Sequence, residues 1–185
     1  MVKTLDILNK LYSELDSWEY GVVIDGIRFG EDDLDQVDWT LYRTSPVSEL
    51  AKRKIGTCWD FVNYQHAELS KAGIEDETYM FLLDCEEYDG DDIITHTFTV
   101  AIVDGEKYWL EQALYAKRGI HKIDGYSDVV KELLSFYKIE SLSSPSFALF
   151  QYDPDTLSQE VTGAEFVSFV TASSPLISFS NGKYR

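Results

Sequence analysis

The residue with the clearest chemical potential in this sequence is Cys58. It lies in segment 56–61, which reads Gly-Thr-Cys-Trp-Asp-Phe, a short turn that leads into a predicted helix. At the amino end of a helix, free backbone N–H groups and the helix dipole stabilise a thiolate, the nucleophilic form of cysteine. The sequence therefore predicts a nucleophile at Cys58. The alternative is a structural thiol, because free cysteine is among the most buried residue types.

A cysteine nucleophile needs a base, and the base needs an orienting group. The sequence contains three histidines. His66 follows Cys58 on the same predicted helix by about two turns, or roughly 12 Å, so it does not reach the thiol and is assigned to the surface or to packing. His121 lies in a loop-to-strand stretch with no partner near it. His96 begins the central predicted strand and is therefore the predicted base.

The orienting acid follows from the register of a predicted hairpin. If residues 104–105, Asp-Gly, form a two-residue turn, Val103 pairs with Glu106. Glu111 then becomes a diagonal neighbour of His96 on the same face of the sheet, within about 7–8 Å. A three-residue turn would move Glu111 to the other face. Taken singly, His96 also fits a buried structural histidine and Glu111 an exposed carboxylate; the combination with Cys58 favours catalysis.

Hydrophobic periodicity and turn signals predict the elements that position these residues. Strands are expected at 78–83, 93–103, 106–113 and 147–152, and a hairpin turn at residues 25–26. Residues 31–38 are expected to be loop, and the tail after Ser174 weakly ordered. Helices are expected at 3–16, 58–72, 127–138 and 162–171, and Gly73 is expected to end the second of these. A further short helix is expected to have Ser45 as its N-cap and Pro46 as its first residue.

The predicted elements follow the order of helices, then antiparallel strands, then helices. This order is typical of an α+β fold. The helix that carries the nucleophile is expected to pack against a central antiparallel sheet, with helical additions at both ends. A length of 185 residues fits a single domain, 1–185, and 44% hydrophobic residues suffice for a core.

Charge and cysteine content exclude several function classes. The net charge is −17 and the isoelectric point is near 4.4, which argues against nucleic acid and anionic membranes as partners, because both bind basic patches. A soluble acidic surface is the simplest interpretation, and a basic partner is the alternative. Two cysteines do not make a disulfide scaffold. The amino end lacks a signal-peptide pattern and no stretch approaches the length of a membrane span, so we expect a cytoplasmic protein.

A cysteine on a helix, followed by a histidine and an acid on adjacent antiparallel strands, resembles the arrangement in the transglutaminase-like cysteine-enzyme superfamily, within the broader papain-like fold. Segments 45–60, 96–100 and 108–111 carry the resemblance and place a transglutaminase-like core at about residues 45–115. The resemblance implies Cys58 as the nucleophile, His96 as general base and acid, and Glu111 as the orienting group, at a position where aspartate is commoner in the family.

Segment 56–61 also resembles the papain proteases proper, but the spacing argues against them. That family places its His and Asn roughly 130–150 residues after the cysteine region, whereas 127 residues follow Cys58 and His96 is 38 residues away. Papain also uses a glutamine shortly before its cysteine for the oxyanion hole, and residues 52–55 read Lys-Arg-Lys-Ile. The transglutaminase-like spacing fits better.

An active Cys58 would attack a peptide or carboxamide carbonyl and form a thioester, with its backbone N–H donating to the oxyanion and His96 protonating the leaving amine. Water or another amine would resolve the thioester, so hydrolysis and acyl transfer both stay open. Trp59 and Trp109 are candidate walls of the substrate cleft, with core packing as the alternative for each. A protein or peptide substrate is the expected partner, and no cofactor is expected.

The acidic segment 84–92 suggests a calcium loop, but its spacing departs from the EF-hand pattern, so we expect a solvated loop and no metal. Cys85 lies far from any histidine motif, and two cysteines without a CxxC pair do not favour zinc. The main alternative to an enzyme is a binding or structural protein that keeps the fold without activity. An acidic mimic of nucleic acid rests on charge alone, and the acids here are dispersed among aromatic residues.

Overall fold

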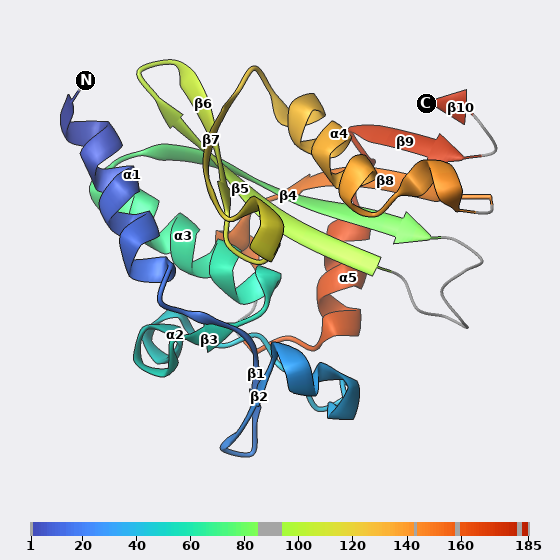
Figure 1. The fold of residues 1–185 in the computed structure, drawn as a ribbon, viewed down its shortest axis with the longest axis horizontal. Coiled ribbons are helices and arrows are strands. Elements are labelled where there is room, and N and C mark those ends of the chain that lie inside the picture. Colours follow the sequence, from blue (N-terminus) through green and yellow to red (C-terminus); the bar gives the residue numbers. More distant parts are fainter. Residues whose placement is uncertain (1, 85–93, 143, 158–159, 181–182, 185) are drawn as a thin grey trace.

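The protein is described here by a computed structural model, which covers residues 2–84, 94–142, 144–157, 160–180 and 183–184. Its centre is a seven-stranded sheet in which every neighbouring pair is antiparallel, in the order β10-β9-β8-β4-β5-β6-β7 (Figure 1). The fold is therefore α+β, as the order of elements predicts. The strands are β4 (Glu75–Asp84), β5 (Ile94–Val103), β6 (Glu106–Glu111), β7 (Gly119–Ile123), β8 (Ser146–Tyr152), β9 (Ile177–Ser180) and β10 (Lys183–Tyr184).

Helices cover both faces of this sheet (Figure 1). One face packs against α1 (Val2–Leu15), α3 (Cys58–Ala72) and α5 (Gly163–Thr171), and the other against α4 (Tyr126–Phe136). Strand alternation separates the two cores: Ala101 and Leu110 pack with α1 and α3, whereas Val100 and Trp109 pack with α4. The helix that begins at Cys58 therefore lies against the central sheet, as expected.

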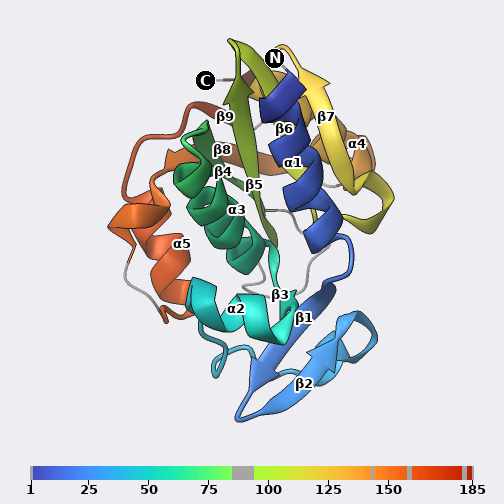
Figure 2. The same ribbon diagram turned by 90° about the vertical axis from the view of Figure 1, so that its left-hand side faces the viewer.

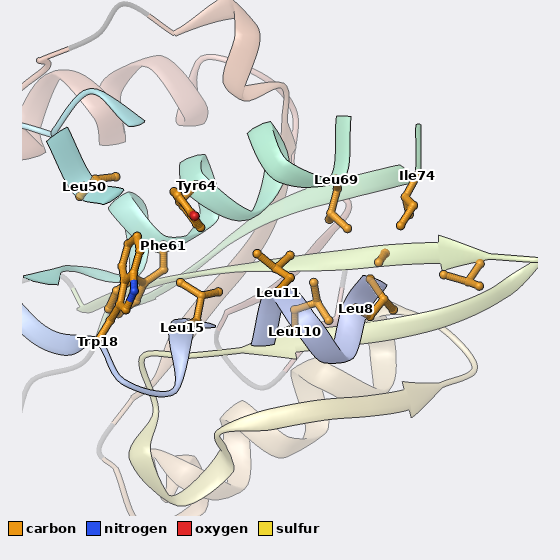
Figure 3. Close-up of a cluster of buried hydrophobic side chains, with 12 residues drawn as sticks. Leu8, Leu11, Leu15, Trp18, Leu50, Phe61, Tyr64, Leu69, Ile74 and Leu110 are labelled. Carbon is orange, nitrogen blue, oxygen red and sulfur yellow. The ribbon is translucent and has the colours of Figure 1, made fainter. Parts of the chain in front are cut away.

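The core between α1 and α3 shows why the amino-terminal residues form a helix. Leu8, Leu11 and Leu15 recur at helical spacing, and all three are buried. They pack with Phe61 and Leu69 of α3, among other residues (Figure 3). This packing fixes α3, and hence Cys58 at its first residue, relative to β5 and β6.

A small second sheet lies next to the start of α3, and its strand β3 directly precedes that helix in the chain (Figure 2). It has the order β2-β1-β3, with β1 (Glu19–Ile24) antiparallel to β2 (Ile27–Gly30) and parallel to β3 (Ile55–Gly56). Gly21 of β1 has φ +157°, and a Cβ there would lie 2.2 Å from the Phe29 carbonyl oxygen. The close pairing of β1 with β2 therefore requires glycine at this position.

Both predicted two-residue turns are confirmed. Asp25 and Gly26 have φ 51° and 80°, and Asp104 and Gly105 have φ 53° and 80°. Positive φ at both central residues is the type I′ geometry, whose twist matches that of the strands it joins. Val103 pairs with Glu106, and the ladder continues in that register to Thr99 and Leu110. The condition on which the position of Glu111 depended is therefore met.

Several boundaries differ from the sequence predictions. The segment after Ser174, predicted to be weakly ordered, contains β9, which lies between β8 and β10 in the sheet. The prediction was wrong because a strand of four residues is too short for alternation to be detected. The helix α2 (Val47–Arg53) has Pro46, not Ser45, as its N-cap. Segment 31–38, predicted as loop, contains the 3-10 helix η1 (Glu31–Gln36). Among the described residues, no helix is long and apolar enough to cross a membrane.

Candidate active site

Cys58 is the first residue of α3, and the predicted bounds of this helix are confirmed. Thr57 is its N-cap and forms a capping box with Asp60, three residues on, which explains why the helix begins here. Gly73 ends it with a left-handed φ of 70°. The sulfur of Cys58 is therefore held at the positive end of a 15-residue helix. Cys58 is buried and makes no disulfide.

His96 and Glu111 form a buried pair at the adjoining ends of β5 and β6. The His96 Nε2 atom lies 2.8 Å from Glu111 Oε2, and the side chains are 2% and 1% exposed. The other carboxylate oxygen, Oε1, accepts hydrogen bonds from the backbone N–H groups of Ala113 at 2.7 Å and Leu114 at 2.8 Å. Both oxygens of Glu111 are thus engaged, and this fixes the orientation of the imidazole. The extra methylene of glutamate does not prevent the contact.

Cys58 completes the group, because its side chain lies close enough to His96 to raise the pKa of the imidazole. Since Nε2 of His96 is bound to Glu111, the ring nitrogen left for the thiol is Nδ1. Burial on its own lowers the pKa of His96, but the Glu111 carboxylate and Cys58 outweigh it and raise the pKa to about 10. His96 therefore carries a proton at neutral pH. The structure brings Cys58, His96 and Glu111 together.

A cavity of about 330 Å³ opens beside His96. Its walls include Tyr20 of β1, Tyr115 of the 3-10 helix η2 (Tyr115–Lys117), and Phe136 and Tyr137 at the end of α4. The lining residues come from five separate parts of the chain, at 20, 31, 95–96, 113–116 and 136–137, which explains why spacing alone did not find them.

The two predicted cleft tryptophans lie elsewhere. Trp59 stacks on Phe166 of α5, with ring centroids 4.7 Å apart, and touches Gly163 so closely that a Cβ there would lie 2.9 Å from the indole. Trp109 is 2% exposed and lies 5.0 Å from the ring of His121. Neither lines the cavity beside His96. The alternative of core packing therefore holds for both, since each indole fills space between a helix and the sheet.

Asp60 is a buried residue of the site that sequence reasoning missed. Its carboxylate accepts hydrogen bonds from the backbone N–H of Ser45 at 2.8 Å and of Thr57 at 3.0 Å, and from the Tyr42 hydroxyl at 2.9 Å. Burial raises the pKa of Asp60 to about 6, although these hydrogen bonds oppose the shift. Asp60 therefore ties segment 42–45 to the turn that presents Cys58. The signal that can find it is the capping-box spacing of Thr57 and Asp60.

Two tyrosines near the thiol also escaped the sequence analysis. Burial, followed by the charge of Cys58, raises the pKa of Tyr20 and of Tyr152 well above the usual value for a phenol. Both phenols therefore stay protonated at neutral pH. No pattern in the sequence marks either residue.

His66 and His121 make other contacts. The Nδ1 atom of His66 lies 2.9 Å from Asp76 Oδ2, on β4, and its Nε2 atom 3.5 Å from Asp155 Oδ1. His66, Asp153 and Asp155 are the one group of metal-ligand type within the described ranges. His121 Nε2 lies 2.7 Å from the Lys117 carbonyl oxygen. Both histidines are thus away from the thiol, as predicted.

The predicted solvated loop at 84–92, including Cys85, lies almost entirely outside the described residues, which stop at Asp84 and resume at Ile94.

No protein-family model matches this chain, and no curated protein is significantly similar to it.

Proposed function

We propose that this protein is a transglutaminase-like cysteine hydrolase or acyltransferase that acts on a peptide or carboxamide bond. Cys58 is the nucleophile, His96 the general acid and base, and Glu111 the group that orients and charges His96. The observation that carries the proposal is a buried His96–Glu111 pair, 2.8 Å apart, that meets a thiol at a helix amino terminus. Three such groups close together are the arrangement that an activated thiol needs.

In the first half-reaction, the Cys58 thiolate attacks the carbonyl carbon and a C–S bond forms. The carbonyl oxygen takes the negative charge, and the backbone N–H of Cys58, free at the start of α3, is placed to donate to it. As the C–N bond breaks, the His96 imidazolium gives its proton to the leaving nitrogen. The amine departs and a thioester remains on Cys58.

In the second half-reaction, neutral His96 takes a proton from water or from an acceptor amine as that molecule attacks the thioester. The C–S bond breaks, and the thiolate–imidazolium pair returns. Glu111 keeps its charge throughout and stabilises the imidazolium. Water gives a hydrolase and an amine gives an acyltransferase; the group of three residues serves both equally well.

Alkylation kinetics test this proposal. In a Cys85→Ser protein, which leaves Cys58 as the single thiol, we expect iodoacetamide to modify Cys58 at pH 6 about 100-fold faster than glutathione, because thiolate is the reactive form. Intact mass spectrometry follows the reaction. If Cys58 reacts no faster than glutathione at this pH, the thiol is not activated and the proposal is wrong.

A further inference from the structure

The cavity beside His96 is the inner part of a longer groove. A second cavity, of about 290 Å³, shares Tyr20, Glu31 and Tyr115 with it. From these three residues the groove continues outward past Asp32 and Asp33 at the start of η1. A molecule bound against His96 can therefore extend along the side chains of η1.

His96 decides which part of a substrate lies in this groove. The general acid must come within hydrogen-bond reach of the leaving nitrogen, so the leaving part of the substrate extends from the imidazole. His96 lines the inner cavity, whereas Cys58 does not. The groove therefore accommodates the leaving part, and the acyl part stays on the side of the sulfur.

The groove is negatively charged. Glu31, Asp32 and Asp33 line it, and none of the three takes part in an ion pair within the described part of the chain. Among the described residues, Arg118 is the only lysine or arginine that lines the two cavities. Charges of one sign that line a cleft attract a ligand of the other sign.

The aromatic walls suit a cation as well. Arg118 already lies over the Tyr115 ring, with its guanidinium carbon 5.2 Å from the centroid, and its Nε donates to the Gln112 carbonyl oxygen at 2.8 Å. This is the geometry of a cation–π contact. Tyr115 is 74% exposed and Phe136 41%, so apolar surface stands open at the mouth of the groove.

We infer that this groove binds a positively charged side chain, lysine or arginine, in the leaving part of a peptide substrate, with Glu31 and Asp32 as the residues that set this preference. The inference rests on the proposed function, since it assigns the leaving side from the role of His96.

Two thiol reagents of opposite charge test the inference. Aminoethyl methanethiosulfonate is a cation and sulfonatoethyl methanethiosulfonate an anion; each forms a mixed disulfide with the thiolate and releases methanesulfinate. For each thiol, the rate constant with the cation is divided by the rate constant with the anion. In the Cys85→Ser protein, we expect this cation-to-anion ratio to be about tenfold higher for Cys58 than for glutathione. In addition, arginine amide should slow alkylation of Cys58 by iodoacetamide, and norleucine amide should not.

A pair of matched double variants locates the effect. Glu31→Gln with Asp32→Asn should lower the cation-to-anion ratio by about threefold or more and remove the protection by arginine amide. Asp104→Asn with Glu106→Gln removes the same charge at the far end of β5, around the type I′ turn. That control should keep both the ratio and the protection.

The two proposals fail in different ways. Fast alkylation of Cys58 with an equal ratio in all three proteins, or without protection by arginine amide, overturns the inference and leaves the proposed function in place. Slow reaction with every reagent, whatever its charge, overturns the proposed function and the inference with it.

Discussion

The helix α3 carries two histidine–carboxylate contacts that differ in one important respect. At its first turn, Cys58 meets the pair His96–Glu111; two turns later, His66 of the helix pairs with Asp76 of β4. The N–O distances are 2.8 and 2.9 Å. By hydrogen-bond length the two pairs are equivalent, so length does not distinguish a catalytic pair from a structural one.

Burial and the third group distinguish them. The side chains of His96 and Glu111 are 2% and 1% exposed, whereas His66 is 17% exposed. The second nitrogen of His96 is left for a thiol, and that of His66 faces Asp155, which is 82% exposed. A histidine with a carboxylate on each side is a stable cation with nothing to activate. A histidine–carboxylate pair therefore gains a chemical role when a nucleophile lies beside the second ring nitrogen of the histidine.

We expect the largest effect in the rate of Cys58 alkylation, which should differ between variants of the two histidines. In the Cys85→Ser protein, His96→Ala should slow alkylation of Cys58 at pH 6 by about 100-fold, because the imidazolium that stabilises the thiolate is gone. His66→Ala is the matched control and should leave the rate within about twofold. Rate constants from iodoacetamide labelling give both values. Equal slowing by the two variants would show that both act through the stability of α3 and not through the thiol.

A second prediction concerns stability as a function of pH. The pKa of His96 is raised above its unfolded value of about 6.5, so folding binds a proton, and that stability is complete below pH 6.5 and lost as pH rises toward 10. Urea unfolding of a Cys58→Ser, Cys85→Ser protein avoids thiol titration. We expect a fall of up to about 1.4 kcal/mol per pH unit above pH 7, the limit for one proton.

Glu111→Gln should abolish most of this fall, because it removes the charge that holds the proton on His96. Asp76→Asn removes the equivalent charge beside His66 and should keep the fall that His96 causes. A slope that persists in Glu111→Gln would mean that the proton resides elsewhere.

The hairpin shows what the sequence can predict about such a site. Asp-Gly between alternating apolar residues dictates a type I′ turn, the turn fixes the register, and the register puts Glu111 on the face of His96. Helix α3 was equally predictable, because Cys58 follows a capping residue and Gly73 provides a left-handed stop. These features are local, and each depends on fewer than about twenty residues.

The walls of the cavity were not predictable, since Tyr20, Tyr115 and Phe136 come from three distant segments that meet only in the folded chain. Spacing cannot reveal contacts of that kind. The tryptophans illustrate the opposite error: Trp59 adjoins Cys58 in sequence, but a helix turns successive side chains by about 100°, so its indole points to α5. The buried role of Asp60 was visible only as a capping-box spacing, which by itself predicts a helix start and no function.

The smallest expected effect tests the outer side of the His66 contact. Asp155 is 82% exposed and lies 3.5 Å from His66 Nε2, so water screens the interaction. Asp155→Asn should change the free energy of unfolding by less than about 0.5 kcal/mol, as measured in urea, and should leave Cys58 alkylation unchanged.

Asp76→Asn, at a carboxylate that is 4% exposed, should cost about 1–3 kcal/mol, because it weakens a buried charged hydrogen bond. If Asp155→Asn costs as much as Asp76→Asn, both carboxylates support His66 equally. If instead Asp155→Asn slows alkylation, the two ends of α3 are coupled, and the contrast between the two histidines is one of degree.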